Sequence, residues 1–252
     1  MRPLAVDIDG TLTRPRPDRG LDPRVFDALR AYSESAPVVI ATGKAFPFPV
    51  GLCEFIDLPK RVIAENGGVV LCETDPGEDP YGGGESDGIV YDGDRAAADA
   101  VAEAYRDAGH DLGWGSPDLV NYWRETEIAV ARDRPLEPLE SIAADHGLEV
   151  VDTGYAYHVK RPDVDKDTGL ETAAAALDRD PSEFLAVGDS ENDAEMFAVA
   201  GESYAVANAD EHALAAADHV TDAAFADGFL EALERATMDT PVDLPEGDGD
   251  DR

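Results

Sequence analysis

The chain has 252 residues, enough for one large domain or a core with a modest insert, and no disulfide is needed to hold it. Its 55 acidic and 20 basic residues give a net charge of −35, which excludes nucleic acid and anionic membranes as electrostatic partners. Because 43% of the residues are apolar, the composition is not that of a disordered acidic chain. Because the acids run along the whole chain, we expect a halophilic protein adapted to a salty cytoplasm rather than an acidic mesophilic protein with an acidic tail.

Short, unbroken apolar runs predict the strands of a parallel sheet that is buried on both faces. These runs are residues 3–7, 38–41, 61–64, 184–187 and 204–206. Helical patterns separate them at residues 22–32, which open with a capping Asp-Pro pair, and at 167–178 and 192–200. Alternating strands and helices predict an α/β fold with a Rossmann-like sheet.

The first motif is Asp7-Ile8-Asp9-Gly10-Thr11, directly after the first apolar run. The chain contains six Asp-x-Asp pairs, but only this one follows a buried strand and precedes Gly-Thr. Two carboxylates at the carboxyl end of a strand repel each other unless a cation or a proton joins them. We therefore interpret Asp7 and Asp9 as part of a ligand site rather than a strand end capped by a turn.

The second motif is Thr42-Gly43-Lys44, after the next strand. It lacks the earlier glycine of a P-loop, which excludes a nucleoside triphosphate cradle. A threonine hydroxyl and a free backbone N–H at a strand end can hold a phosphate oxygen. By itself the motif is equally compatible with an ordinary turn.

The middle of the chain, residues 68–158, predicts a second, α+β domain inserted into the first. Two helices, at 95–108 and 136–145, lie among four or five strands. The strands named by the pattern are residues 68–72, 89–91, 126–131 and 155–160. Alternation at Tyr155, Tyr157 and Val159 favours an antiparallel sheet with helices on one face. Residues 1–67 and 159–237 would form the core, with a mobile loop at 75–88 and a disordered acidic tail at 238–252.

The third motif is Lys166, which stands among Asp163, Asp165 and Asp167. The chain has only four lysines, and a surface ion pair contributes little to stability. A phosphate-binding lysine is therefore the preferred interpretation.

The fourth motif, residues 188–193, again follows a buried strand. If a helix begins near Ser190, Asp193 lies in its first turn, close to Asp189 in the preceding loop. With the first pair, these acids would complete an all-oxygen site, for which Mg²⁺ is suited. The alternative is ordinary helix capping by Asp189 or Ser190.

The remaining candidates are expected to be structural. Cys53 and Cys72 are too few for a disulfide framework or a cysteine zinc site. The five histidines share no metal-type spacing and are expected to be surface or packing residues. Trp114, Trp123, Tyr155, Tyr157 and His158 are expected in the core of the inserted domain, although the last three could face a cleft.

Nothing in the sequence suggests export or a membrane anchor. The N-terminus has no apolar stretch long enough for a signal peptide, and no run approaches the roughly 20 apolar residues of a membrane span. We expect a cytoplasmic protein, and the sequence leaves open whether it is a monomer or a homodimer.

In their order along the chain, the four motifs resemble those of the haloacid dehalogenase (HAD) superfamily of phosphatases. The resemblance covers residues 1–237 and implies a C2-type cap at the inserted domain. It implies Asp7 as the nucleophile and Asp9 as the general acid/base. It further implies substrate binding by Thr42, Gly43, Lys44, Lys166 and Asn192, and metal binding by Asp7, the backbone carbonyl of Asp9, Asp189 and Asp193.

Within the superfamily, residues 41–48 and 64–69 and the modest cap look most like the archaeal phosphoglycolate phosphatases. Two departures are Asp167, where many relatives have glycine, and Lys44, where many have arginine. The resemblance implies an Mg²⁺-dependent hydrolase that converts 2-phosphoglycolate to glycolate and phosphate through an aspartyl phosphate. The substrate's carboxylate would then need a cation, for which the candidates are Lys44, Arg124, Arg132, Arg134, Lys160 and Arg161.

Three other functions compete with this interpretation. The nearest is a phosphosugar phosphatase of the same superfamily. A phosphomutase usually carries a smaller cap inserted earlier, and the segment between Asp9 and Thr42 is too short for one. An idle binding protein would have lost one of the acids or the lysine, and none is missing.

Overall fold

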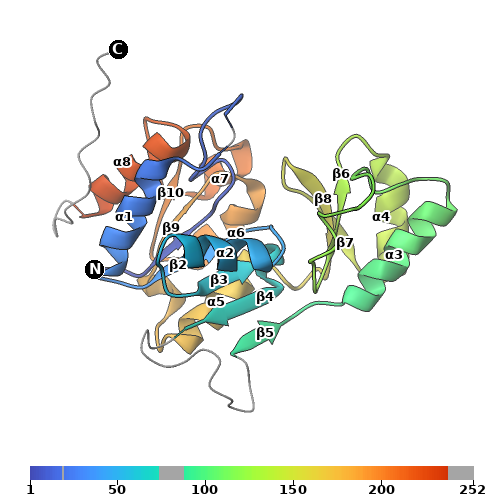
Figure 1. Cartoon of the computed structure of the whole chain (residues 1–252), viewed down its shortest axis with the longest axis horizontal. Helices are drawn as coiled ribbons and strands as arrows, with labels where there is room; N and C mark the ends of the chain where they lie inside the picture. Colours follow the sequence, from blue (N-terminus) through green and yellow to red (C-terminus); the bar gives the residue numbers. More distant parts are fainter. Residues whose placement is uncertain (19, 74–87, 238–252) are drawn as a thin grey trace.

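The computed structural model of the chain describes residues 1–18, 20–73 and 88–237 (Figure 1). Within these residues, one sheet of eight strands forms the core, in the order β11-β10-β9-β1-β2-β3-β4-β5. The strands from β11 to β3 are parallel, whereas β3, β4 and β5 pair antiparallel. Their bounds are β1 (Leu4–Val6), β2 (Val38–Ala41), β3 (Arg61–Ala64), β4 (Val69–Cys72), β5 (Ile89–Tyr91), β9 (Leu185–Gly188), β10 (Glu202–Ala205) and β11 (His219–Val220).

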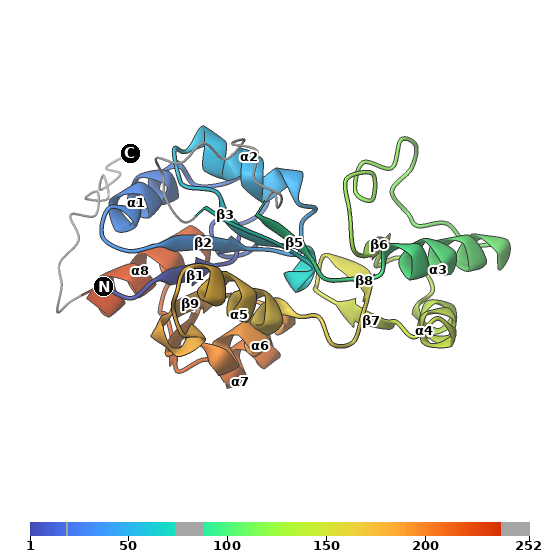
Figure 2. The ribbon, with the colours of Figure 1, turned by 90° about the horizontal axis from the view of Figure 1, so that it is seen from below.

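Helices cover both faces of this sheet. Helices α1 (Pro23–Ser33), α2 (Pro47–Phe55) and α8 (Phe225–Thr237) pack on the face that contains Leu4 and Val6. Helices α5 (Lys166–Ala176), α6 (Glu191–Val199) and α7 (Glu211–Ala216) pack on the face that contains Ala5, as Figure 2 shows. Burial on both faces explains why the strand sequences are continuously apolar. The predicted α/β fold is confirmed.

The cap is a separate, smaller unit. In the described part of the chain it has three antiparallel strands in the order β6-β8-β7, namely β6 (Ile128–Ala131), β7 (Glu149–Asp152) and β8 (Ala156–Lys160). Helices α3 (Arg95–Asp107) and α4 (Leu136–Asp145) pack on the face formed by Ile128, Val130, Tyr157 and Val159. The strands lie between the core and these two helices (Figures 1 and 2). The helix-free face of the cap sheet is therefore turned toward the core.

The expectation that the strands at 68–72 and 89–91 belong to the inserted sheet is wrong. Both join the core sheet as β4 and β5, and β7 is a cap strand that the sequence pattern did not indicate. The reason is the short η1 (Glu65–Gly67), where three successive residues have φ of 52°, 54° and 102°. This left-handed reversal sends the chain straight back along β3, so β4 has no length in which to leave the sheet.

The observed strands move the expected boundary between the core and the cap. We propose a core of residues 1–91 and 161–237 with a cap at 92–160, in place of the boundaries at 68 and 158.

The disordered tail expected at 238–252 and the mobile loop expected at 75–88 lie outside the described residues, except for Gly88. Among the helices that are described, none combines the length and apolar character needed to cross a membrane. A second short 3-10 helix, η2 (Pro181–Glu183), precedes β9.

Candidate active site

The carboxyl ends of three neighbouring strands bring three of the four sequence motifs together, and the start of α5 adds the fourth, Lys166. Strand β1 lies between β2 and β9, and the Asp7 N–H donates to the carbonyl of Val187 in β9 at 3.0 Å. The ends of parallel strands meet at one sheet edge, where ligands of α/β proteins bind. A cavity opens at this edge, and its lining is made by Asp7, Asp9, Thr42, Gly43, Lys44, Arg124, Thr153, Tyr155, His158, Asp189, Ser190 and Asn192.

Lys166 lies beneath this cavity and joins two of the acids. It is the first residue of α5, and its side chain is fully buried. Its Nζ donates to Asp7 Oδ1 at 2.8 Å and to Asp193 Oδ1 at 2.6 Å. Burial disfavours the ammonium charge, but the two carboxylates outweigh it and raise the lysine's pKa. Lys166 is therefore a fixed positive charge at the floor of the site.

Asp193 uses both carboxylate oxygens inside the protein. Its Oδ1 accepts from Lys166, and its Oδ2 accepts from the backbone N–H groups of Asp189 at 2.9 Å and Ser190 at 3.1 Å. It lies in the first turn of α6, as predicted, and Ser190 is the capping residue. A Cβ on Gly188 would lie 2.4 Å from the Asp193 carboxyl carbon, so only glycine leaves room for it. Asp193 thus ties the lysine to the loop that carries Asp189.

Asp7, Asp189 and Asp193 form a compact acidic cluster, with one oxygen from each within 4.8 Å of the others. Burial, together with the neighbouring acids, raises the pKa of Asp7 to about 7 against the opposing effect of Lys166. Burial, together with Asp7 and Asp193, raises the pKa of Asp189 to about 9. One lysine does not neutralise three buried carboxylates. A divalent cation with oxygen ligands would, so the donor set fits Mg²⁺.

Gly10 makes the approach of Asp189 to Asp7 possible. Its φ is 85°, and a Cβ there would lie 1.9 Å from Asp189 Oδ2. Thr11 donates its hydroxyl to the other oxygen, Oδ1, at 3.3 Å, and no described residue donates to Oδ2. Asp189 therefore has one oxygen free of protein partners beside the cavity.

Asp9 and Lys44 lie at the mouth of the site. The Asp9 side chain is half-exposed, and its Oδ2 pairs with Lys44 Nζ at 2.8 Å. Lys44 Nζ also lies 5.6 Å from the ring centroid of Tyr155, which belongs to the cap. Thr42 is buried, and its hydroxyl accepts from the Lys44 N–H at 3.2 Å. The second motif is thus part of the cavity wall, rather than an isolated turn.

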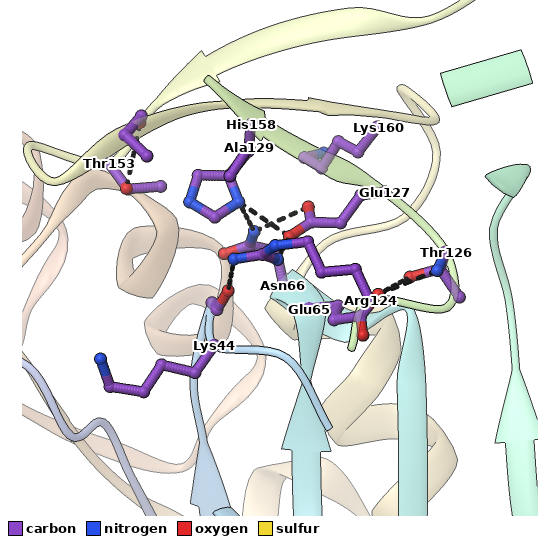
Figure 3. Close-up of polar contacts among 12 residues, drawn as sticks. Lys44, Glu65, Asn66, Arg124, Thr126, Glu127, Ala129, Thr153, His158 and Lys160 are labelled. Atoms are coloured by element: carbon purple, nitrogen blue, oxygen red, sulfur yellow. Dashed lines mark hydrogen bonds and ion pairs between the residues drawn. The ribbon is translucent and has the colours of Figure 1, made fainter. Parts of the chain in front are cut away.

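A buried polar network, not foreseen from the sequence, joins the cap to the core (Figure 3). Asn66 Nδ2 donates to Glu127 Oε2 at 3.0 Å, and Asn66 Oδ1 accepts from Asn192 Nδ2 at 2.9 Å. Arg124 pairs with Glu127 and donates through Nη2 to the carbonyl of Gly43 at 3.0 Å. The sequence feature that could have indicated this network is Glu127, a charged residue directly before the apolar strand β6.

The same network corrects the expectation for His158. Its side chain is buried, but it is not a packing residue: Nδ1 lies 2.7 Å from Glu127 Oε1 and the ring lines the cavity. Tyr155 also lines the cavity, and stacks on Trp114 at 5.8 Å. Trp114 and Tyr157 pack on the cap core as expected, whereas Trp123 is 46% exposed.

The candidate cations for a substrate carboxylate separate into two groups. Lys44 and Arg124 line the cavity. The other four are held by acids elsewhere: Arg132 by Asp152, Arg134 by Asp111 and Asp133, Lys160 by Glu149 and Asp165, and Arg161 by Asp163 and Asp92.

Comparison with known proteins agrees with this geometry. Residues 140–233 match the model of the haloacid dehalogenase-like hydrolase family. The phosphoglycolate phosphatase of Natronomonas pharaonis is 64% identical over 234 residues, which cover 93% of this chain and 97% of the relative. That of Haloarcula marismortui is 59% identical and covers 92% and 95%.

Solved structures resemble the fold. A Thermoplasma acidophilum protein, 0175, superposes with a TM-score of 0.76 at 22% identity, covering 93% of this chain and 97% of the other. A haloacid dehalogenase-like hydrolase from Bacteroides thetaiotaomicron gives a TM-score of 0.71 at 22% identity, covering 93% and 99%.

Proposed function

The chain belongs to the archaeal phosphoglycolate phosphatases among the haloacid dehalogenase-like hydrolases, and we propose that it hydrolyses 2-phosphoglycolate to glycolate and phosphate with Mg²⁺ as cofactor. The observation that carries the proposal is the buried set of Asp7, Lys166, Asp193 and Asp189 at one sheet edge. In this arrangement Asp7 would be the nucleophile, Lys166 a fixed positive charge beneath the cavity, and Asp189 a ligand of the metal.

The metal would be held by the carboxylates of Asp7 and Asp189 and by the backbone carbonyl of Asp9, with Asp193 in the same cluster. When bound, it would offset negative charge on the phosphoryl oxygens and on the acids around them. The protein supplies the rest of the positive charge locally, through Lys166, because the overall charge of −35 repels an anionic substrate.

The reaction proceeds in two steps at Asp7. Its carboxylate attacks phosphorus and displaces the glycolate oxygen, giving an aspartyl phosphate, and water then hydrolyses this intermediate. Asp9, half-exposed at the cavity mouth, protonates the leaving oxygen and later removes a proton from the attacking water. Lys166 orients Asp7, and Thr42 with the Gly43 backbone contacts the transferring phosphoryl group.

A panel of phosphate esters, assayed with purified protein, Mg²⁺ and molar KCl, tests the proposal. We expect 2-phosphoglycolate to have the highest kcat/KM, and a chelator to remove the activity. A higher kcat/KM for a phosphosugar would replace 2-phosphoglycolate as the substrate. Full activity after chelation would overturn the role of the metal.

A further inference from the structure

If the proposed function holds, the site must bind two anionic groups. Lys166 and the metal serve the phosphoryl group, which every phosphate ester shares, so they do not select 2-phosphoglycolate. Its carboxylate needs a separate donor on the cavity wall. The cavity-lining residues that can carry positive charge, in the described part of the chain, are Lys44, Arg124 and His158.

Lys44 and Arg124 already contact other groups of the protein. Lys44 pairs with Asp9. Arg124 uses Nη1 on Glu127 and Nη2 on the Gly43 carbonyl, and its remaining Nε has no partner among the described residues but is fully buried, out of reach of a ligand. Arg124 therefore holds the cap against the loop of the second motif.

His158 is different because its unpartnered ring nitrogen is not fully buried: among the described residues, the buried side-chain atom without a partner is Nε of Arg124. It lies in β8 between Tyr157 and Val159, which pack on the cap helices, so alternation turns it to the helix-free face. Its Nδ1 faces Glu127 and Asn66, and no described residue bonds Nε2, which lies on the opposite edge of the ring (Figure 3). The ring also lines the cavity.

Glu127 fixes the tautomer. Although burial disfavours its charge, His158 and Arg124 keep the pKa of this carboxyl below its usual value, so it is a carboxylate and only accepts hydrogen bonds. The short contact at 2.7 Å is then donated by Nδ1–H. Nε2 is left as the atom that can meet a ligand.

We propose that His158 is the specificity-determining residue, which binds the carboxylate of 2-phosphoglycolate through Nε2–H, and that Glu127 is the positioning residue behind it. With the substrate bound, the ring lies between two carboxylates, with Nδ1–H facing Glu127 and Nε2–H facing the substrate. A phosphosugar lacks this carboxylate, so His158 and Glu127 would not increase its affinity.

The test compares two substrates on one variant. Ethyl phosphate replaces the carboxylate of 2-phosphoglycolate by a methyl group and otherwise uses the same phosphoryl machinery. In His158→Gln, we expect the ratio of kcat/KM for 2-phosphoglycolate to kcat/KM for ethyl phosphate to fall more than tenfold, mainly through KM. His146→Gln, on the exposed end of α4, is the matched control and leaves the ratio unchanged. An unchanged ratio in folded His158→Gln would overturn the proposal.

A double-mutant cycle tests Glu127 as a positioning residue. If Glu127 acts through His158, Glu127→Gln lowers the ratio, but adding it to His158→Gln lowers the ratio no further. Additive losses would show that Glu127 acts independently, which overturns its assigned role.

A measurement on the wild type does not depend on a variant that folds. Nitrogen-15 NMR of histidine side chains, with Mg²⁺ present, reports the hydrogen bonding of each ring nitrogen. Adding 3-phosphonopropionate, the non-hydrolysable analogue of 2-phosphoglycolate, should shift the Nε2 signal of one histidine, and propylphosphonate should leave it unchanged. No change with either compound overturns the proposal.

The substrate preferences of wild type and His158→Gln distinguish failure of this inference from failure of the proposed function. A wild type that does not prefer 2-phosphoglycolate over ethyl phosphate overturns both. A wild type that prefers it, with a preference that survives in His158→Gln, overturns the role of His158 alone.

Discussion

At the scale of single residues, the site depends on charges that the protein buries and on glycines that let them approach. Asp193 and Lys166 are fully buried, and each contacts the other. Removing one partner of such a pair leaves an uncompensated buried charge, which costs about 3–5 kcal/mol. Gly10 and Gly188 add a steric condition, because a side chain at either would overlap a carboxylate of the cluster. The chemistry and the fold therefore share the same residues here.

Asp7→Asn should reduce kcat at least about a thousandfold, because an amide does not attack phosphorus. The amide keeps an oxygen that can accept from Lys166, so the variant should fold. The measurement is kcat on 2-phosphoglycolate, with circular dichroism as the folding control. Activity within tenfold of wild type would contradict the covalent mechanism.

Asp189→Ala should remove activation by Mg²⁺ together with activity. The variant loses the carboxylate oxygen that faces the cavity without a protein partner. Isothermal titration of the metal into wild type and variant checks this, and Asp145→Ala, at the exposed end of α4, is the control. Equal metal affinity in Asp189→Ala and wild type would remove Asp189 from the metal site.

At the scale of elements, short turns decide which surfaces meet. The reversal at η1 keeps β4 and β5 on the core and carries Glu65, which accepts from the N–H groups of Glu125 and Thr126 in the cap at 3.0 and 2.9 Å. The left-handed residues at this turn are costly by themselves, of the order of 1 kcal/mol each, and such strain is found at functional sites. Here the turn at η1 holds the helix-free face of the cap sheet toward the carboxyl ends of the core strands.

A partly buried glutamate in helix α6, Glu195, is expected to lower the stability of the protein at high pH. Burial, with Asp165 as the next cause, raises the pKa of Glu195 to about 7. A folded pKa above the unfolded value means that stability is complete below about pH 4.5 and is lost as the pH rises through about 7. Glu195→Gln should therefore raise stability at pH 8 by roughly 1 kcal/mol, discounted for partial exposure, and change nothing at pH 4.

Thermal melts of wild type and Glu195→Gln at the two pH values, in the same salt, measure this difference. Glu234→Gln, on α8, is a control for the loss of one negative charge. An equal gain at pH 4 and pH 8 would contradict the assignment to Glu195.

At the scale of the whole molecule, the net charge of −35 is the dominant long-range term. Many of the basic residues in the described ranges are in ion pairs with neighbouring acids, but 20 basic residues cannot neutralise 55 acids. The repulsion between exposed charges is screened over about 10 Å at 0.1 M salt and about 3 Å at 1 M. Stability is accordingly expected to depend on salt more than on any single contact.

We predict that the Tm rises steeply between about 0.1 and 2 M KCl, and that millimolar Mg²⁺ replaces part of this effect by binding acidic clusters. Scanning calorimetry across KCl concentrations measures it, and MgCl₂ matched to KCl in ionic strength separates binding from screening. A flat Tm would remove the halophilic interpretation.

The sequence by itself determined the parts of this protein that depend on neighbouring residues. Unbroken apolar runs predicted the parallel core strands, because burial on both faces leaves no polar position. Asp7, Thr42 and Asp189 each follow such a run, and the ends of parallel strands share one edge, so their meeting could be inferred. The capping position of Ser190 and the place of Asp193 in the first turn of α6 also follow from local pattern.

Only the tertiary structure decided the rest, because it depends on contacts between distant segments. Whether β4 joins the core or the cap is a matter of register and turn geometry, and a strand's own pattern is the same in either sheet. The network of Asn66, Glu127 and His158 joins residues 31 to 92 positions apart. In sequence these are a polar loop residue, a surface-type acid and an unremarkable histidine, and burial against one another is what gives them a role.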